Sequence, residues 1–354
     1  MALTNTTETQ TGGAARTGGI DPVAAWLFVI CAMVFAMVVL GGVTRLTESG
    51  LSMVNWRPVT GWLPPMGQAE WQAAFDAYRQ SPEYHHINRG MSLESFQGIF
   101  WLEYLHRLFG RIIGIAFFVP FVWFLATGRL HGMLLVKCAA LFVLGGLQGV
   151  LGWYMVKSGL IDEPSVSQYR LAAHLGLALA IYLFALWVAW GIVQPRPAAI
   201  PAAQVPVAKA AAGLLAFISL TVFSGALVAG LDAGLLYNTF PLMDGALFPA
   251  DGFDLRPFYL NFFEDRATVQ FDHRVLAMIT VCLVAAFGVR VRQSDAPEGL
   301  KRAVGLLTAA VLLQAFLGIA TLLTVVPVTL GALHQAGAVL LLTAALWCLH
   351  QARR

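Results

Sequence analysis

The sequence predicts an all-α integral membrane protein whose eight transmembrane helices form two pseudo-symmetric four-helix bundles. Of its 354 residues, 58% are hydrophobic and only 12% are charged. A soluble domain carries about 25% charged residues, so a bilayer is the solvent that suits this chain. Apolar runs of about 20 residues, enough to cross the hydrocarbon core, recur along the chain. Matching motifs in its two halves complete the prediction.

The apolar runs give the expected spans in order. The first half (23–193) and the second half (210–350) each supply four, with a Pro- and Ala-rich linker at 194–209. The spans cover residues 23–43, 99–126, 133–156, 171–193, 210–230, 269–289, 303–324 and 328–350. Two connections are long, 44–98 and 231–268, and the first contains an amphipathic segment at 70–78. The others are short.

Charge near the span ends predicts the orientation. The short connections and the C-terminal tail are dense in arginine and lysine, which favours the cytoplasmic side for them and for both termini. Residues 1–22 are expected to form a cytoplasmic tail that lacks the pattern of a cleavable signal or transit peptide. The expected location is therefore the bacterial cytoplasmic (inner) membrane, with the long loops outside. A net charge of +3 without a basic run gives no indication of a nucleic-acid partner.

The two halves repeat their motifs in the same order. EYLHR at 103–107 matches QFDHR at 270–274, LQGVLG at 147–152 matches LQAFLG at 313–318, and a histidine opens the fourth span of each half. The repeat contains His106, His174, His273 and His334. All four lie on even-numbered spans near the N-terminal end, which places them at the outer side of the membrane. Two histidines per half is the number that ligates one haem iron from opposite faces.

Other interpretations of the histidines are weaker. Histidines in membrane helices also form interhelical hydrogen bonds, but duplicated pairs favour a cofactor. Zinc would need clustered ligands, and no CxxC or CxxCH occurs among the four cysteines, which are expected to be buried hydrophobic residues: Cys31, Cys138, Cys282 and Cys348. A di-iron site would need two Glu-x-x-His pairs, and Gln270 replaces the acid in the second half. His85, His86, His131 and His350 receive no role.

That replacement predicts a division of labour between the halves. Glu103 lies one helical turn from His106 and on the same face, whereas Gln270 cannot titrate. We therefore expect reactive chemistry in the first half and electron transfer in the second. A charge favoured by the helix dipole is an equally good explanation of Glu103 from the residues alone. Arg107 and Arg274 follow the histidines at the level that haem propionates would reach, although lipid headgroups are an alternative contact.

These residues resemble a known family. GGVTRLTESGLSM at 41–53, WRPVTG at 56–61 and the EYLHR segment are similar to haem A synthases of the proteobacterial and mitochondrial type, over nearly the whole chain. The resemblance implies that the C8 methyl group of haem O is oxidised to the formyl group of haem A by successive hydroxylations. It implies that His106 and His174 hold the substrate haem, that His273 and His334 hold the iron of a permanent haem b, and that Glu103 is the essential acid.

The resemblance also implies partners and leaves alternatives. It implies that haem O synthase, cytochrome oxidase assembly factors and membrane lipid are partners of the protein. Formation of a homo-oligomer stays open. Some relatives carry a cysteine pair in the first outer loop, but residues 44–98 contain no cysteine, which excludes electron delivery through thiols there. The alternative function is a diheme b-type cytochrome that exchanges electrons with a quinone. A transporter ranks below it, because the repeats are parallel and lack matching helix breaks.

Overall fold

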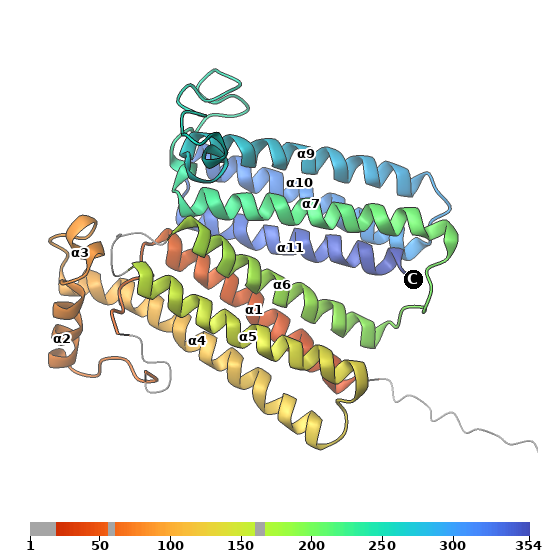
Figure 1. The fold of residues 1–354 in the computed structure, drawn as a ribbon, viewed down its shortest axis with the longest axis horizontal. Coiled ribbons are helices and arrows are strands. Elements are labelled where there is room, and N and C mark those ends of the chain that lie inside the picture. The colour runs from red at the N-terminus through yellow and green to blue at the C-terminus, as the bar shows by residue number, and fades with distance from the viewer. Residues whose placement is uncertain (1–18, 56–60, 160–166) are drawn as a thin grey trace, which may run out of the picture.

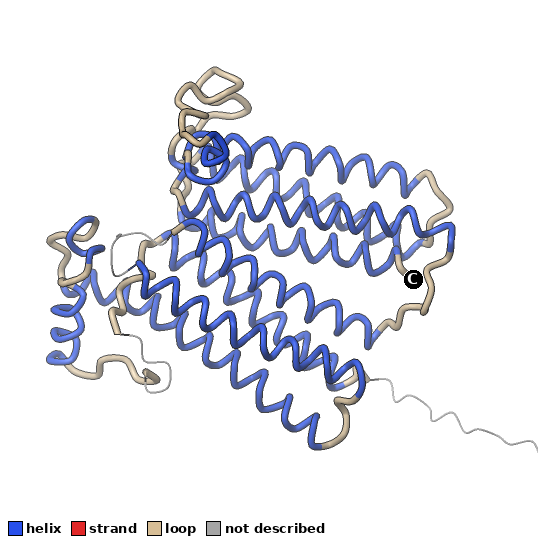
Figure 2. Tube along the Cα trace, viewed as in Figure 1, coloured by secondary structure: helices blue, strands red, loops and turns tan. Residues whose placement is uncertain are grey.

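Eight long helices form the molecule. The computed structural model describes residues 19–55, 61–159 and 167–354, so the expected tail over 1–18 and the segment 56–60 of the WRPVTG motif lie outside it. The long helices are α1 (Pro22–Leu46), α4 (Leu93–Ala126), α5 (Gly132–Gly159), α6 (Gln168–Val193), α7 (Val205–Gly230), α9 (Arg266–Arg292), α10 (Glu298–Leu323) and α11 (Val328–Ala352). They confirm the predicted spans. In the described ranges all regular structure is helical (Figure 2).

The helices pack in the same pattern in both halves. In the first half α1 packs against α4 and α6, and α5 packs against α6; in the second half α7, α9, α10 and α11 repeat these contacts in the same order. Between the halves, α1 packs against α11, and α7 packs against α6. Exchanging the halves exchanges these two contacts. The arrangement in Figure 1 is therefore consistent with two pseudo-symmetric bundles.

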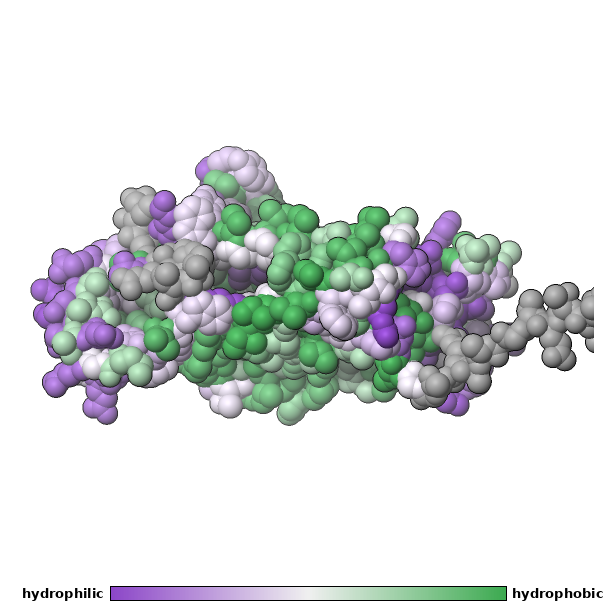
Figure 3. All heavy atoms as spheres, turned by 90° about the horizontal axis from the view of Figure 1, so that it is seen from below, coloured by the Kyte–Doolittle hydropathy of each residue, from purple (hydrophilic) through white to green (hydrophobic). Residues whose placement is uncertain are grey.

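Apolar surface covers the middle of the bundle on the face drawn in Figure 3. All eight helices are long and apolar enough to cross a membrane. Figure 3 shows hydrophobic side chains over the middle of the helices and hydrophilic ones gathered at both ends. The chain is a multi-pass membrane protein. The expectation of buried cysteines holds for Cys31, Cys138 and Cys348 but is wrong for Cys282, which is exposed on α9 because an apolar outer face needs no protein partner in lipid.

Both long connections lie at the same end of the bundle (Figure 1). The first contains α2 (Gln68–Tyr78) and α3 (Pro82–His86), whose aromatic side chains pack on the first turns of α4. The second contains η2 (Ala233–Leu235), η3 (Phe258–Leu260) and α8 (Asn261–Glu264), and the linker between the halves contains η1 (Ala202–Gln204). Glu48 and Asp232 begin the two long connections with the same left-handed φ of 51°. Asp232 also forms an ion pair with Arg45 of the other half, with 2.7 Å between the charged atoms.

The halves differ in how far their outer helices are buried. The apolar windows of α4 and α5 are each 11% buried, whereas those of the equivalent α9 and α10 are 28% and 17% buried. Fewer buried side chains mean fewer packing contacts that must break when a helix moves. The looser packing of the first half is therefore confined to α4 and α5, since the apolar window of α1 is 44% buried against 39% for α7, and those of α6 and α11 are both 39% buried.

Glycines set the distance between the halves. Gly230 at the end of α7 lies so close to the start of α6 that an added Cβ would be 2.6 Å from the Cα of Gln168. On the other side, the Nε2 of Gln335 on α11 donates to the carbonyl of Val38 on α1 at 2.8 Å, in space left by Gly42. Small residues at helix crossings are how membrane helices gain close packing.

The Gly230→Ala variant should destabilise the contact between the halves by about 1–3 kcal/mol, because the new methyl group meets backbone that cannot turn away. Gly213→Ala is the matched control on the same helix, since nothing lies within 4 Å of its Cβ position. Thermal unfolding of the purified proteins in detergent checks this expectation. Equal midpoints for the two variants would show that the crossing tolerates a methyl group.

Candidate paired-histidine site

Each histidine of the repeat lies against a glycine on the preceding long helix of its half. A Cβ added to that glycine would lie 2.8–3.0 Å from the Cε1 of the imidazole, closer than side chains pack. The glycine therefore makes the space that the ring occupies. The four contacts are Gly41 with His106, Gly152 with His174, Gly225 with His273, and Gly318 with His334.

In each half the structure brings the two repeated histidines near one another. His106 on α4 is close enough to His174 on α6 for their imidazoles to interact electrostatically. His273 on α9 has the same relation to His334 on α11. Each pair thus joins the second and fourth long helices of one half. Ligation of iron by these rings stays a prediction.

Two glutamines that the sequence motifs contained, but to which no role was given, contact the histidines of the fourth helices. The Nε2 of Gln148 donates to the carbonyl of His174 at 3.0 Å and lies 3.2 Å from both ring nitrogens. The Nε2 of Gln314 donates to the carbonyl of His334 at 3.0 Å and lies 3.1 Å from its Nδ1. Each glutamine is one turn before a glycine that contacts the ring. That i, i+4 spacing is the signal that could have identified them.

Glu103 is buried beneath the first outer loop, with 3% of its surface exposed. Its Oε2 accepts hydrogen bonds from the Oγ of Ser52 and from the backbone N–H of Met53, both at 2.7 Å. Its Oε1 forms an ion pair with Arg107 one turn further along α4. Three donors therefore converge on one carboxylate, which compensates part of the cost of burying a charge. The loop partners could not be identified from the sequence, because they depend on how the loop folds back.

The arginines after the histidines fix the outer loops. Arg107 donates to the carbonyls of Met53 (2.9 Å) and Asn55 (3.3 Å). Arg274 donates to those of Tyr237 (2.7 Å) and Thr239 (2.8 Å), which lie 184 residues after Met53 and Asn55. The guanidinium fork suits two carbonyls as well as two carboxylate oxygens. The predicted contact with propionates is not tested by these bonds.

The halves differ where the acid is replaced. Gln270 is 2% exposed, and its Nε2 donates to the carbonyl of Tyr237 at 3.0 Å. Glu103 instead accepts from the N–H of Met53, the repeat counterpart of Tyr237. Both side chains hold the same part of the loop, but only the first half holds it with an acid. The sequence predicted this difference between an acid and an amide, and the structure places both side chains directly under the outer loops.

A second buried acid, Glu83 of α3, lies near Glu103. Glu83 is 3% exposed, and its Oε1 accepts a hydrogen bond of 3.3 Å from the hydroxyl of Tyr78, which in turn accepts from Asn88. Burial, together with the negative charges of Glu103 and Glu48, raises the pKa of Glu83 to about 8. Glu83 therefore holds a proton at neutral pH. This could not be predicted from the sequence, because the burial of Glu83 depends on how the first outer connection folds.

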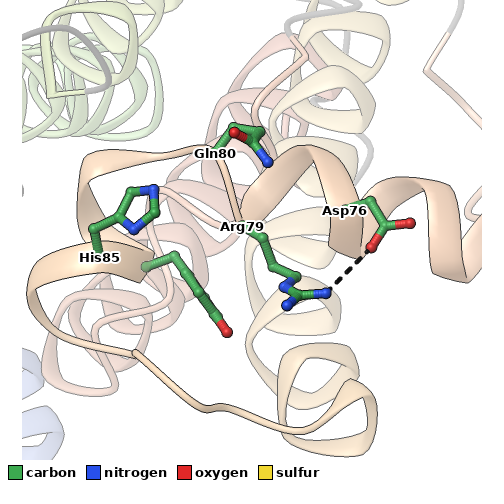
Figure 4. Close-up of a pocket in the computed structure, with 5 residues that line it drawn as sticks. Asp76, Arg79, Gln80 and His85 are labelled. Atoms are coloured by element: carbon green, nitrogen blue, oxygen red, sulfur yellow. Dashed lines mark ion pairs between the residues drawn. The ribbon is translucent and has the colours of Figure 1, made fainter.

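A surface hollow in the first outer loop is separate from the histidine pairs. It has a volume of about 360 Å³ and is lined by Asp76, Arg79, Gln80, Tyr84 and His85 (Figure 4). Its ion pair between Asp76 and Arg79 is 3.7 Å long and half-exposed, so it contributes little to stability. His85 has no histidine counterpart in the second half. The hollow is a feature of the loop surface.

The fold and the site define a class of multi-pass membrane protein with one histidine pair in each of two repeated halves. Residues 24–346 match the family model described as cytochrome oxidase assembly protein, and the chain belongs to this family. It is 52% identical to the heme A synthase of Nitrosospira multiformis over 94% of both chains, and 51% identical to that of Nitrosomonas eutropha over 92% of both. It is 46% identical to "Heme A synthase COX15" of Arabidopsis thaliana, over 94% of this chain and 75% of the plant protein.

The free energy of unfolding should fall as pH rises, because Glu83 loses its proton. A carboxyl whose pKa is raised in the folded state stabilises the fold fully below its unfolded value of about 4.5, and this contribution is lost as pH rises to about 8. The slope attributable to one such group is about 1.4 kcal/mol per pH unit at most. Thermal unfolding between pH 5 and 9 should therefore show a steeper decline for the wild type than for Glu83→Gln. Glu94→Gln, at an exposed acid of α4, is the control and should follow the wild type.

Proposed function

We propose that the chain oxidises the C8 methyl group of haem O to a formyl group, giving haem A, with the substrate held by His106 and His174 and a permanent haem b held by His273 and His334. The observation that carries the proposal is the duplicated packing of imidazole pairs on glycine. Relatives that are about 50% identical over most of both chains bear the name of this activity. The division assigns substrate binding to residues 23–193 and haem b to residues 210–350.

The residues fit a haem held by two histidines. Each pair contributes one imidazole from each of two helices, and each ring lies in a space that a Cβ would fill. The Nδ1 of His106 is buried and has no hydrogen-bond partner among the described residues. An imidazole without another polar partner is available to a ligand. Arg107 and Arg274, at the ends of the same sites, are the proposed contacts of the propionates.

The remaining residues of the first half supply the chemistry around the substrate. A bound haem b supplies one-electron transfer. Glu103 either takes up the proton released as the methyl group is oxidised or stabilises positive charge on the macrocycle. Both roles need a carboxylate, and the amide of Gln270 supplies neither. The first outer loop, held by Arg107, covers Glu103 and excludes water from it.

The proposed location is the bacterial cytoplasmic membrane, with both termini in the cytoplasm. Arginine and lysine are concentrated in the connections 128–132, 194–209 and 290–302, which lie at the end opposite the two long loops (Figure 1). Both histidine pairs then lie toward the outer side. Haem O synthase and oxidase assembly factors are the proposed partners, because the substrate and product are lipid-soluble haems that pass between membrane proteins.

A diheme cytochrome that exchanges electrons with a quinone is the second candidate, since the same four histidines would serve it. Both pairs lie near the same end of the bundle, so such a carrier would not move electrons across the bilayer. The buried acid in one half alone also favours a reaction there. Haem b in both sites of the purified protein would favour the carrier.

The four His→Ala variants should separate the two sites. His273→Ala and His334→Ala should lose haem b together with product formation, because one axial ligand cannot hold the iron as two do. His106→Ala and His174→Ala should keep haem b but lose haem O or haem A. Extraction of the pigments followed by mass analysis, from membranes that also produce haem O, measures both quantities. Full haem b in His273→Ala would refute its assignment.

Glu103→Gln should retain both haems and lower haem A formation by at least about a hundredfold, as expected for a residue that handles a proton or a developing charge. The amide is the natural replacement in the second half, so the loop contacts should persist. The control is Glu94→Gln on the exposed first turn of the same helix. A normal yield of haem A from Glu103→Gln would remove the catalytic role.

A further inference from the structure

One hydrogen bond distinguishes His273 on α9 from His106 on α4, the two histidines that the repeat makes equivalent on the second long helix of each half. The Oγ of Ser224 on α7 lies 2.9 Å from the Nδ1 of His273. The hydroxyl proton of Ser224 is already donated to the carbonyl of Thr221 at 2.7 Å. Ser224 can therefore only accept from the ring, so Nδ1 carries the proton. The lone pair of His273 is then on Nε2.

Further polar contacts support this arrangement. The hydroxyl of Thr221 lies 2.9 Å from that of Thr280 on α9, one to two turns beyond His273. Ser224 and Thr280 are 7% and 3% exposed, so neither contact competes with water. The helix that carries His273 is thus tied to α7 at the level of the glycine contact and again on one side of it. Buried, fully satisfied hydrogen bonds of this kind rigidify the groups that form them.

The first half lacks this support. Gly41 and Gly225 make the same contact with their histidines, which aligns α1 with α7 at an offset of 184 residues. At that offset Leu40 replaces Ser224 and Met37 replaces Thr221, while the α4 counterpart of Thr280 is Ile113. The Nδ1 of His106 is accordingly buried without a hydrogen-bond partner in the described part of the chain. The histidines of the fourth helices do not differ in this way, because Gln148 and Gln314 contact both of them.

We infer that Ser224 is a positioning residue that makes the second site a permanent haem site, and that its replacement by Leu40 leaves the first site able to release its haem. An imidazole whose Nδ1–H is hydrogen-bonded is fixed in orientation and is a stronger donor to iron through Nε2. A ring held only by apolar contacts has neither advantage. The inference deepens the proposed function, on which it rests, by naming what separates substrate from cofactor.

The looser packing of the first half agrees with this assignment. The helix that carries His106 and its neighbour α5 have 11% of their apolar windows buried, against 28% and 17% in the second half. A substrate must enter and leave once per turnover, whereas a cofactor must stay. A weakly supported ligand on a loosely packed helix suits the first requirement, and a hydrogen-bonded ligand on a buried helix suits the second.

The test compares haem loss from the wild type, Ser224→Ala and Ser219→Ala. Ser219 lies on the same helix and donates only to the carbonyl of Leu215, so it is the matched control. Excess apomyoglobin captures released haem b, and the rate is read from absorbance. Ser224→Ala should lose haem b about tenfold faster and show a raised reduction potential and altered low-spin g values, because the ligand becomes a weaker donor. Ser219→Ala should match the wild type in all three measurements.

The reverse variant keeps the test decisive if Ser224→Ala folds poorly. Leu40→Ser places a hydroxyl at the equivalent position beside His106 and should slow the release of haem O from protein produced with haem O present. Unchanged loss rates and potential in Ser224→Ala, or unchanged release from Leu40→Ser, would overturn the inference and leave the proposed function standing. Wild-type protein without haem b would overturn the proposed function itself.

Discussion

The close contact between an imidazole and a glycine backbone is the constraint on which the rest of the structure depends. In a bilayer, apolar side chains gain little by moving from lipid to protein, so helices associate through close packing and hydrogen bonds. At four crossings a glycine allows a histidine ring to lie where a Cβ would be. Each contact fixes the rotation and the height of one helix against its neighbour. Because the contacts occur in pairs, they also bring two imidazoles into each half.

Duplication supplied a second copy of this arrangement, and a few substitutions made the copies different. Both halves leave their first helix through a left-handed residue, Glu48 or Asp232, and both fix the following loop with an arginine of the next long helix. The framework is therefore shared. The differences are concentrated at the ligands: an acid or an amide one turn before the histidine, and a leucine or a serine beside its Nδ1. Changes of this size alter chemistry without altering the fold.

The sequence predicted the eight spans and the four paired histidines because both leave periodic signals: long apolar runs and motifs repeated at a nearly constant offset. It also predicted that Glu103 and Gln270 divide the halves. It did not predict Ser224, because the alignment of α1 with α7 is displaced by the longer first loop and rests on glycine contacts seen only in space. The loop carbonyls bound by Arg107 and the burial of Glu83 depend on tertiary folding of irregular segments. The expectation that Cys282 is buried was wrong, because apolar residues of membrane helices face lipid as readily as protein.

The proposed function places reactivity and exchange in the same half, and there is a physical reason for this. A buried carboxylate is held at Glu103 only while the outer loop supplies its donors, so the acid is assembled by a segment that lies over the site. Release of a product from beneath that segment requires the neighbouring helix to give way, which a weakly buried α4 with an unsupported His106 allows. In the proposed function the second half, which holds Gln270 in place of Glu103, releases no product. Its serine, threonines and deeper packing are therefore compatible with its task, whereas the same features in the first half would hold the product in place.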